Sequence, residues 1–309
     1  MAIAGCSCSG KFSNTGIPNV KPFGVTKTKY LVPLNADDGT RNGLDLTTAL
    51  GPQILAAVNN PDPSKRWYPF NDIQNNAPTE SDANFETTDL GERYKTRNGI
   101  VTESWQVWGV DTRYFDKVKS ACIEFGIVDV DVCGNMRLVK EGTMGYPRPA
   151  NKSSYHSMFV DATADASSKV TFTYDFDYTS SYADLWMLPL SEFGAYNPLY
   201  LYGLIDVNLT ITPTSATEAT VVASFDYGNA ASPMAWTGGV VGDLTLNNLT
   251  AGGTVTTSTF VESTTTPGTY TLTHAAATTS DTLELEVFRA ATAIKVNGYE
   301  NVGTEFTAL

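Results

Sequence analysis

Residues 170–178, VTFTYDFDY, decide the fold class because apolar and polar side chains alternate along the whole stretch. A period of two residues is typical of a β-strand with one buried and one solvated face. Residues 204–212, LIDVNLTIT, repeat the same alternation. We therefore predict a mainly β protein built from antiparallel sheets. In the first stretch the side expected to be buried carries Val170, Phe172, Tyr174, Phe176 and Tyr178.

Turn and helix signals extend this pattern along the N-terminal region. Asn98-Gly99 stands between two extended runs and predicts a hairpin turn. The Cys133-Gly134-Asn135 stretch predicts a second turn, between FGIVDVDV and MRLVKE. Residues 111–122, DTRYFDKVKSAC, have apolar side chains at helical spacing, and residues 50–58 predict a further helix. We expect an antiparallel sandwich or barrel-forming domain with a short helix.

Composition changes near Pro213. Residues 1–212 hold 18 Lys and Arg, whereas residues 213–309 hold 2 and carry 22 Thr. We predict domains over 1–212 and 213–309, with TPTSATEA as the linker. The second domain has the size and strand rhythm of an immunoglobulin-like sandwich. Its strands are expected at 219–225, 240–246, 254–261, 268–273, 282–288 and 293–297.

Two aromatic segments follow no period. Residues 59–84 are dense in Asn, Pro and Asp, and we predict an arm that packs on a neighbouring chain; a loop folded over its own domain is the alternative. Residues 183–204 are too apolar to be left in water, so they are either core or a contact with another chain. The candidate subunit contacts are Trp67, Tyr68, Phe70, Trp186, Tyr196 and Tyr200.

The composition argues against catalysis. The sequence has two His residues, no phosphate-binding glycine loop and no serine or zinc hydrolase motif. Asp129 and Asp131, like Asp175 and Asp177, have the separation of strand neighbours, and we interpret both pairs as solvent-facing rather than as a glycosidase or calcium site. We expect no enzyme activity and no cofactor. The net charge of -13 is unsuited to gripping nucleic acid.

Four cysteines, Cys6, Cys8, Cys122 and Cys133, are too few for a disulfide framework. Their spacing matches no common zinc pattern, so we expect reduced thiols and no metal. Residues 3–6, IAGC, match a lipoprotein cleavage site, but five residues without Lys or Arg precede the cysteine. We therefore expect no lipid anchor.

The order of these elements resembles that of bacteriophage tail tube, or major tail, proteins, especially those of phages infecting Bacteroidetes. The resemblance rests on the arm, on FETTDLGERYKTRNGIVTESWQV, FDKVKSA and FGIVDVDVCGNMRLV, and on VTFTYDFDY. Residues 241–287 are also similar to the immunoglobulin-like domains that phage structural proteins append at their C-termini. In element order, the resemblance covers nearly the whole chain.

The resemblance implies a virion structural protein assembled in the host cytoplasm. Its subunits form rings, commonly homohexamers, that stack through a long loop into the tail tube, with the immunoglobulin-like domain outside. The implied partners are the protein itself, other tail proteins and DNA, which passes through the lumen at ejection without specific binding; no membrane is implied. An acidic lumen would not retain phosphate, and Asp175 and Asp177 are the lumen candidates.

Three alternatives remain at this point. A ring or connector of a short tail would use a related fold, and a capsid decoration protein is another virion component. A secreted binding module with two β domains would require an export signal, which MAIAGCSCSG does not supply.

Overall fold

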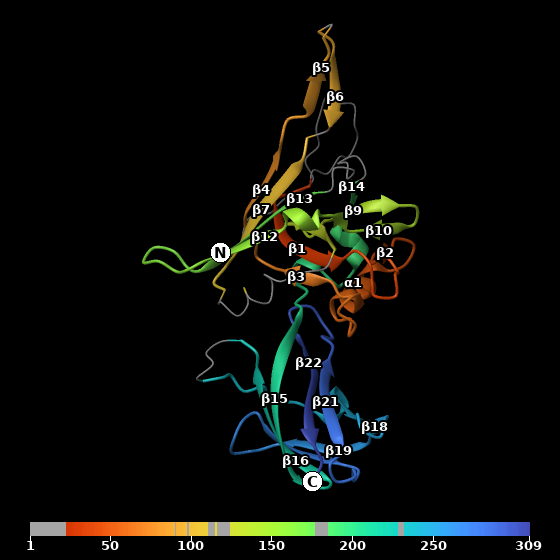
Figure 1. Cartoon of the computed structure of the whole chain (residues 1–309), viewed down its shortest axis with the longest axis vertical. Coiled ribbons are helices and arrows are strands. Elements are labelled where there is room, and N and C mark those ends of the chain that lie inside the picture. Colours follow the sequence, from red (N-terminus) through yellow and green to blue (C-terminus); the bar gives the residue numbers. More distant parts are fainter. Residues whose placement is uncertain are drawn as a thin grey trace. The chain divides into compact units, whose positions relative to one another are not determined.

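The structure is a computed structural model that describes residues 23–89, 91–97, 99–110, 115, 124–176, 185–227 and 232–309 (Figure 1). The predicted mainly β fold is confirmed. Among the described residues, no helix is long and apolar enough to cross a membrane. The chain forms two compact units, one reaching to Tyr202 and including Ala293–Lys295, the other comprising Gly203–Thr292 and Val296–Leu309.

The middle layer of the first unit is an eight-stranded antiparallel sheet. Its order is β2-β10-β9-β8-β1-β3, with β11 paired to β8 and β14 paired to β9. The strands are β1 (Thr26–Pro33), β2 (Leu44–Asp45), β3 (Tyr68–Phe70), β8 (Phe125–Asp131), β9 (Met136–Glu141), β10 (Met144–Tyr146), β11 (Arg148–Pro149) and β14 (Leu185–Leu188).

A four-stranded antiparallel sheet, in the order β12-β13-β7-β4, covers one face of that layer. The indole of Trp105 stacks on Phe172 at 4.2 Å between ring centroids, and Phe70 from the first sheet meets both rings edge-on. The alternation predicted for VTFTYDFDY is confirmed through Phe176, while Tyr178 lies outside the described residues. The strands are β4 (Gln74–Glu80), β7 (Val101–Trp108), β12 (His156–Val160) and β13 (Lys169–Asp175).

Helix α1 (Leu50–Val58) covers the other face of the middle layer, with the bounds that the sequence predicted. Leu50, Ile54 and Val58 recur every four residues and lie in one core with Tyr30 and Val128. The helix predicted at residues 111–122 falls outside the described residues apart from Phe115. The described part of the unit also contains three short 3₁₀ helices: η1 (Lys152–Ser154), η3 (Leu190–Phe193) and η4 (Pro198–Tyr200).

Strands β1 and β8 are therefore buried on both faces, and this overturns the prediction for Asp129 and Asp131. All seven residues of β8 are buried, with Asp129 5% and Asp131 0% exposed. The sequence VDVDV alternates in the same way whether the second face is solvated or covered by another sheet. Here Val128 and Val130 lie in the core with α1, and the side chain of Asp129 meets charged groups between the two sheets.

Lys29, which is fully buried, joins the two sheets electrostatically. Its Nζ lies 2.5 Å from Asp129 Oδ1 in the same sheet and 2.9 Å from Glu103 Oε2 on β7 of the other. Arg137 Nη2 binds the second oxygen of Asp129 at 2.6 Å, and the Tyr174 hydroxyl donates to Glu103 at 2.9 Å. Two cations thus balance two carboxylates, the condition under which buried charge is tolerated.

Asp131 closes the turn between β8 and β9. Its Oδ1 accepts the backbone N–H groups of Cys133 (2.8 Å) and Asn135 (2.9 Å), and its Oδ2 accepts the N–H of Gly24 (2.9 Å). The turn predicted at Cys133-Gly134-Asn135 is confirmed. The expectation of a reduced thiol is wrong for Cys133, which is disulfide-bonded; the other three cysteines lie outside the described residues.

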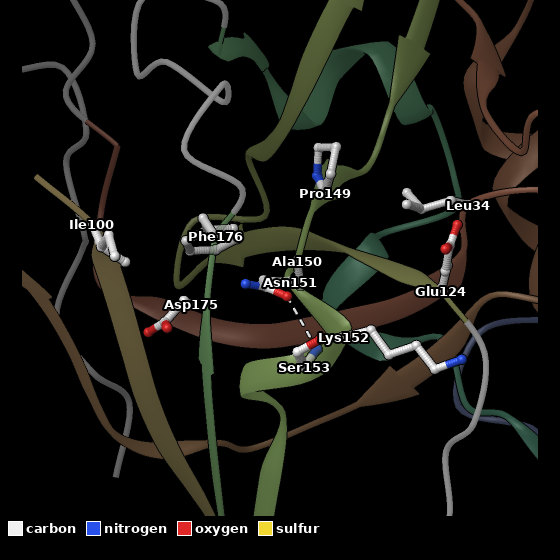
Figure 2. A pocket seen from close by; sticks show the side chains of 10 residues that line it. All are labelled: Leu34, Ile100, Glu124, Pro149, Ala150, Asn151, Lys152, Ser153, Asp175 and Phe176. Carbon is white, nitrogen blue, oxygen red and sulfur yellow. Dashed lines mark hydrogen bonds between the residues drawn. The ribbon is translucent and has the colours of Figure 1, made fainter. Parts of the chain in front are cut away.

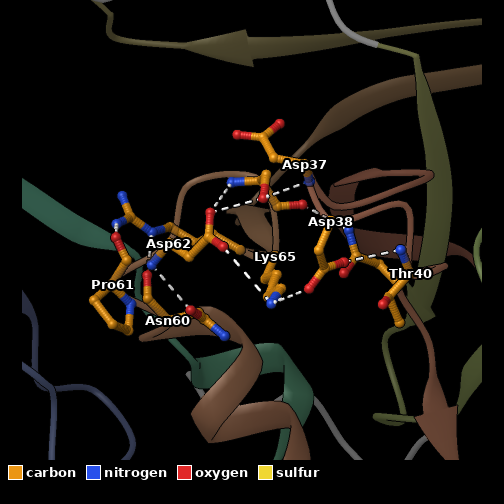
Figure 3. Close-up of polar contacts among 10 residues, drawn as sticks. Asp37, Asp38, Thr40, Asn60, Pro61, Asp62 and Lys65 are labelled. Atoms are coloured by element: carbon orange, nitrogen blue, oxygen red, sulfur yellow. Dashed lines mark hydrogen bonds and ion pairs between the residues drawn. The ribbon is translucent and has the colours of Figure 1, made fainter.

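The segment 59–84, predicted as an arm, is only partly one. Its first part folds back on its own unit, which was the alternative interpretation. Lys65 Nζ lies 2.7 Å from Asp38 Oδ2 and thereby joins this loop to the loop after β1 (Figure 3). The Asp37 N–H donates to Ser64 Oγ at 3.1 Å, and β3 then pairs with β1. Hydrogen bonding to Lys65 lowers the pKa of Asp38.

The second unit is a two-sheet sandwich whose sheets share β15 (Leu204–Ser215). Residues 204–206 pair in parallel with β22, and residues 207–215 pair with β16. The sheets are therefore β15-β16-β20-β19 and β15-β22-β21-β17-β18. In chain order these are the ABED and CFG sheets of an immunoglobulin-like sandwich, with β18 as C′. The remaining elements are β16 (Glu218–Phe225), η5 (Val241–Asp243), β17 (Leu244–Asn248), β18 (Thr254–Val255), β19 (Thr257–Glu262), β20 (Thr269–His274), β21 (Thr282–Arg289) and β22 (Gly298–Thr307).

The predicted boundary at Pro213 is wrong by about ten residues. Pro213 lies within β15 and pairs with Ala219, so the predicted linker is the β15–β16 hairpin. The ladder shifts register between Pro213 and Ser215, which is where a strand accommodates proline. Residues 203–212 also lack Lys and Arg, so the change in composition fits a boundary at Gly203 equally well.

Three of the strands predicted for this unit also need correction. The predicted run 240–246 holds η5 before β17, and the run 254–261 is divided between β18 and β19. No strand occupies 293–297, whose first three residues belong to the first unit. The last strand is instead β22, whose irregular pattern ENVGTEF contains a bulge opposite β21 and was not predicted. The predicted pattern of DTLELEVF is confirmed, with Leu283, Leu285 and Val287 at most 1% exposed.

Replacing Lys29 by Met is expected to destabilise the first unit by about 3–5 kcal/mol, because Glu103 and Asp129 then stay buried without their shared cation. Lys27 on the same strand provides a matched control. It pairs with Asp72 in the open, with side chains 40% and 78% exposed, so Lys27→Met is expected to cost no more than about 1 kcal/mol. Urea denaturation measures both variants, and equal losses would contradict the assigned role of Lys29.

Acid is expected to weaken the same cluster. Burial alone would raise the pKa of Asp129, but Lys29 and Arg137 outweigh burial and hold it at about 2. Because this pKa lies below the unfolded value of about 3.9, the stabilisation is complete above pH 4 and is lost as the pH falls toward 2. The free energy of unfolding is therefore expected to fall more steeply over this range in the wild type than in Asp129→Asn. Parallel slopes would place the acid sensitivity elsewhere.

Candidate functional site

A two-stranded arm leaves the body of the first unit (Figure 1). Strands β4 and β7 pair up to the Glu80–Val101 position, and Ser81 and Ile100 continue the pairing through two hydrogen bonds of 2.9 Å. Beyond them β5 (Asn84–Thr87) and β6 (Arg93–Arg97) form a sheet of their own. At 3.3 Å per residue the arm extends roughly 25 Å past Glu80.

The hairpin turn predicted at Asn98-Gly99 is wrong. Gly99 lies along the strand pair, where an added Cβ would come within 2.0 Å of the Ser81 carbonyl oxygen. Glycine is required there because of this close approach, which has nothing to do with turn formation. The turn lies between Thr88 and Glu92, closed by the Gly91 N–H donating to the Thr88 carbonyl at 2.8 Å, with Gly91 at φ 83°. The short runs NFET and RYKT around Asp89 and Gly91 are the signal that could have located it.

Within the described residues, no other strand pairs with β5 or β6 at the arm tip. Every residue of β5 is exposed, and Phe85 and Tyr94 remain 50% and 54% exposed. An isolated two-stranded hairpin is marginally stable in water, and a third strand or a packing surface is normally needed. The exposed aromatic rings on such a ribbon are typical of a contact surface. The arm is therefore the candidate functional site.

Two of the predicted contact residues are buried. Trp67 is 1% and Phe70 8% exposed, because Trp67, just before β3, lies in one core of the first unit and Phe70, at the end of β3, lies in the other. Tyr68 is half-buried, and its hydroxyl donates to the Pro63 carbonyl at 3.0 Å. Trp67 and Phe70 therefore cannot anchor a neighbouring chain, which corrects that prediction.

The segment 185–201 mixes core and surface. Leu188, Phe193 and Leu201 are buried, which explains its apolar composition. Trp186 and Tyr200 stay 47% and 40% exposed, each with a lysine Nζ above its ring, Lys140 at 4.0 Å and Lys295 at 4.5 Å. Tyr196 is half-buried, and its ring lies against Gly51 of α1. Of the six predicted contacts, Trp186 and Tyr200 thus present the most surface.

The lumen candidate Asp175 is held by its neighbours. Its Oδ1 accepts the Thr102 hydroxyl at 2.5 Å, and its backbone N–H donates to Ser154 Oγ at 2.7 Å. The other outward side chains of β7 and β13 are mostly uncharged: Thr102, Ser104, Gln106, Thr171 and Thr173. Asp177 lies outside the described residues.

A pocket of about 560 Å³ opens beside Asp175 (Figure 2). Glu124, Lys152 and Asp175 contribute charges of both signs to its wall. The Asn151 side chain accepts the Ser153 N–H at 3.0 Å, and the Asn151 N–H donates to the Asp175 carbonyl at 2.8 Å. The first bond caps η1, and the second joins Asn151 to β13. No group of acidic, His or Cys side chains within the described ranges has the arrangement of a metal site.

Comparison with known proteins found no matching family model, no matching curated protein and no matching solved structure.

Two tryptophans test the distinction between core and surface in this unit. Trp67→Ala is expected to cost about 3–5 kcal/mol of stability, because it empties a site in the core beside Tyr30. Trp186→Ala is expected to stay within about 0.5 kcal/mol of the wild type, because the removed ring is half solvated. Urea denaturation of both variants measures the difference. A small effect at Trp67 would contradict its burial.

Proposed function

We propose that the chain is a virion structural protein, the ring-forming subunit of a bacteriophage tail tube. The observation that carries the proposal is the arm formed by β4 to β7. It projects from its unit with exposed aromatic rings, and among the described strands β5 and β6 at its tip pair only with each other. Such an element is energetically reasonable when another chain covers it. The resemblance in element order supports a tube subunit as the kind of assembly.

In this proposal rings, commonly of six copies, stack into the tube, and the arm supplies contacts between copies. The immunoglobulin-like unit stands on the outside of the tube, and other tail proteins bind its ends. Trp186 and Tyr200 are further contact candidates because they expose large aromatic area. The protein acts in the virion tail after assembly in the host cytoplasm, and it has no catalytic role.

The outward face of β7 and β13 is the proposed channel lining. Hydroxyl and amide groups predominate on this face, and its charges are Lys169 at one end of β13 and Asp175 at the other, so it offers phosphate few cations to bind. The net charge of -13 also disfavours binding of a polyanion. DNA would therefore pass through the lumen without being retained.

Electron microscopy of the negatively stained, purified chain tests the proposal. Rings or tubes with a central channel are expected, and particles that remain monomeric at high concentration would contradict it. A truncated variant provides the matched comparison. Glu80 and Val101 face each other across the ladder, so an Asn-Gly turn can replace residues 81–100. This variant is expected to keep the thermal stability of the unit and to lose assembly.

A further inference from the structure

The strand register gives the two faces of the arm tip opposite charge. Phe85 stands opposite Lys95 and Thr87 opposite Arg93, so these four side chains share one face, the basic face.

The other face carries the remaining aromatic ring. Glu86 stands opposite Tyr94, and the Tyr94 hydroxyl donates to the Glu92 carboxylate. These three side chains form the acidic face. Each face thus consists of one aromatic ring flanked by two charges of a single sign.

The contacts within each face hold its ring and charges together. On the basic face the Arg93 guanidinium lies 4.8 Å from the centroid of the Phe85 ring. On the acidic face the bond from Tyr94 to Glu92 fixes the phenol beside a carboxylate. Within the described part of the chain, no ion pair links Glu86, Glu92, Arg93 or Lys95 to another residue. All four charges are exposed and unmatched.

We propose that the arm tip binds the arm tip of a second copy of this chain, basic face against acidic face. In this contact Arg93 and Lys95 of one copy meet Glu86 and Glu92 of the next, and Phe85 packs beside Tyr94. This inference rests on the proposed self-assembly and names the partner of the arm. Pairing of like faces is excluded, because it would juxtapose charges of one sign.

A contact between different faces has a structural consequence. Each bound arm still presents one unused face, so the contact is head-to-tail and repeats from copy to copy. Such a series closes into a ring or continues along a stack, whereas a contact between identical faces would stop at a dimer. The charge pattern of a single hairpin therefore favours an extended assembly.

Charge reversal with rescue tests the pairing. The basic-face variant is Arg93→Glu with Lys95→Glu, and the acidic-face variant is Glu86→Lys with Glu92→Lys. Each makes both faces of the arm alike in sign, and each is expected to raise the concentration needed for half-assembly by about tenfold or more. Combining all four changes in one chain restores opposite faces, and assembly is expected to return. An equimolar mixture of the two double variants is expected to assemble as well. Sedimentation velocity gives the half-assembly concentration in each case.

The control reverses two exposed charges away from the arm, Asp161→Lys with Asp165→Lys, and is expected to assemble like the wild type. Thermal unfolding of every variant is expected to match the wild type, because all the changed side chains are exposed. If both double variants assemble as readily as the wild type, the pairing of the faces is overturned, whereas the proposed function is not. If the double variants lose assembly and the fourfold variant does not recover it, the two faces bind another partner, and the proposed pairing is also overturned. A wild-type chain that stays monomeric overturns both proposals.

Discussion

The buried Lys29 cluster is the constraint on which the first unit depends. Its ammonium group lies between Asp129 of one sheet and Glu103 of the other, so the two sheets can pack only in the arrangement that brings these carboxylates together. Glu103 lies on β7, two residues after the point where the arm leaves the body. The cluster therefore fixes the root of the arm while the surrounding aromatic core excludes water. Because a buried charge without its partner is strongly destabilising, a packing that separates Lys29 from these carboxylates is disfavoured.

Sequence patterns identified the elements that have a solvated face. The alternation in 170–176 and 282–288 predicted which side chains are buried, and the helix at 50–58 was located from its composition. Where both faces of a strand are covered, the pattern misled. The acidic positions of FGIVDVDV lie between two sheets, and only a distant lysine on β1 explains them. Trp67 and Phe70 were misassigned because a three-residue strand in an aperiodic segment leaves no periodic signal.

The sequence predicted that an arm projects from the first unit, but it placed the arm in the wrong segment. A projecting arm was expected at 59–84, and the projecting part is centred on 84–97 instead. The error came from giving Asn98-Gly99 the role of a turn, which hid the true turn between Thr88 and Glu92. Once that turn is located, the register follows, and with it the separation of charges onto two faces. The alternation of side chains along one strand does not fix its register with a partner strand. The register of the arm therefore had to come from the strand pairing in the structure.

Hydrogen–deuterium exchange along residues 84–97 tests the central claim most directly, namely that the arm tip is covered by another copy of the chain. In dilute protein its backbone amides are expected to exchange rapidly, since no third strand among the described residues pairs with the hairpin. On raising the concentration into the assembled range, these amides are expected to become protected, while those of the second unit's core strand β21 change little. Equal exchange of residues 84–97 in dilute and assembled protein would contradict the account.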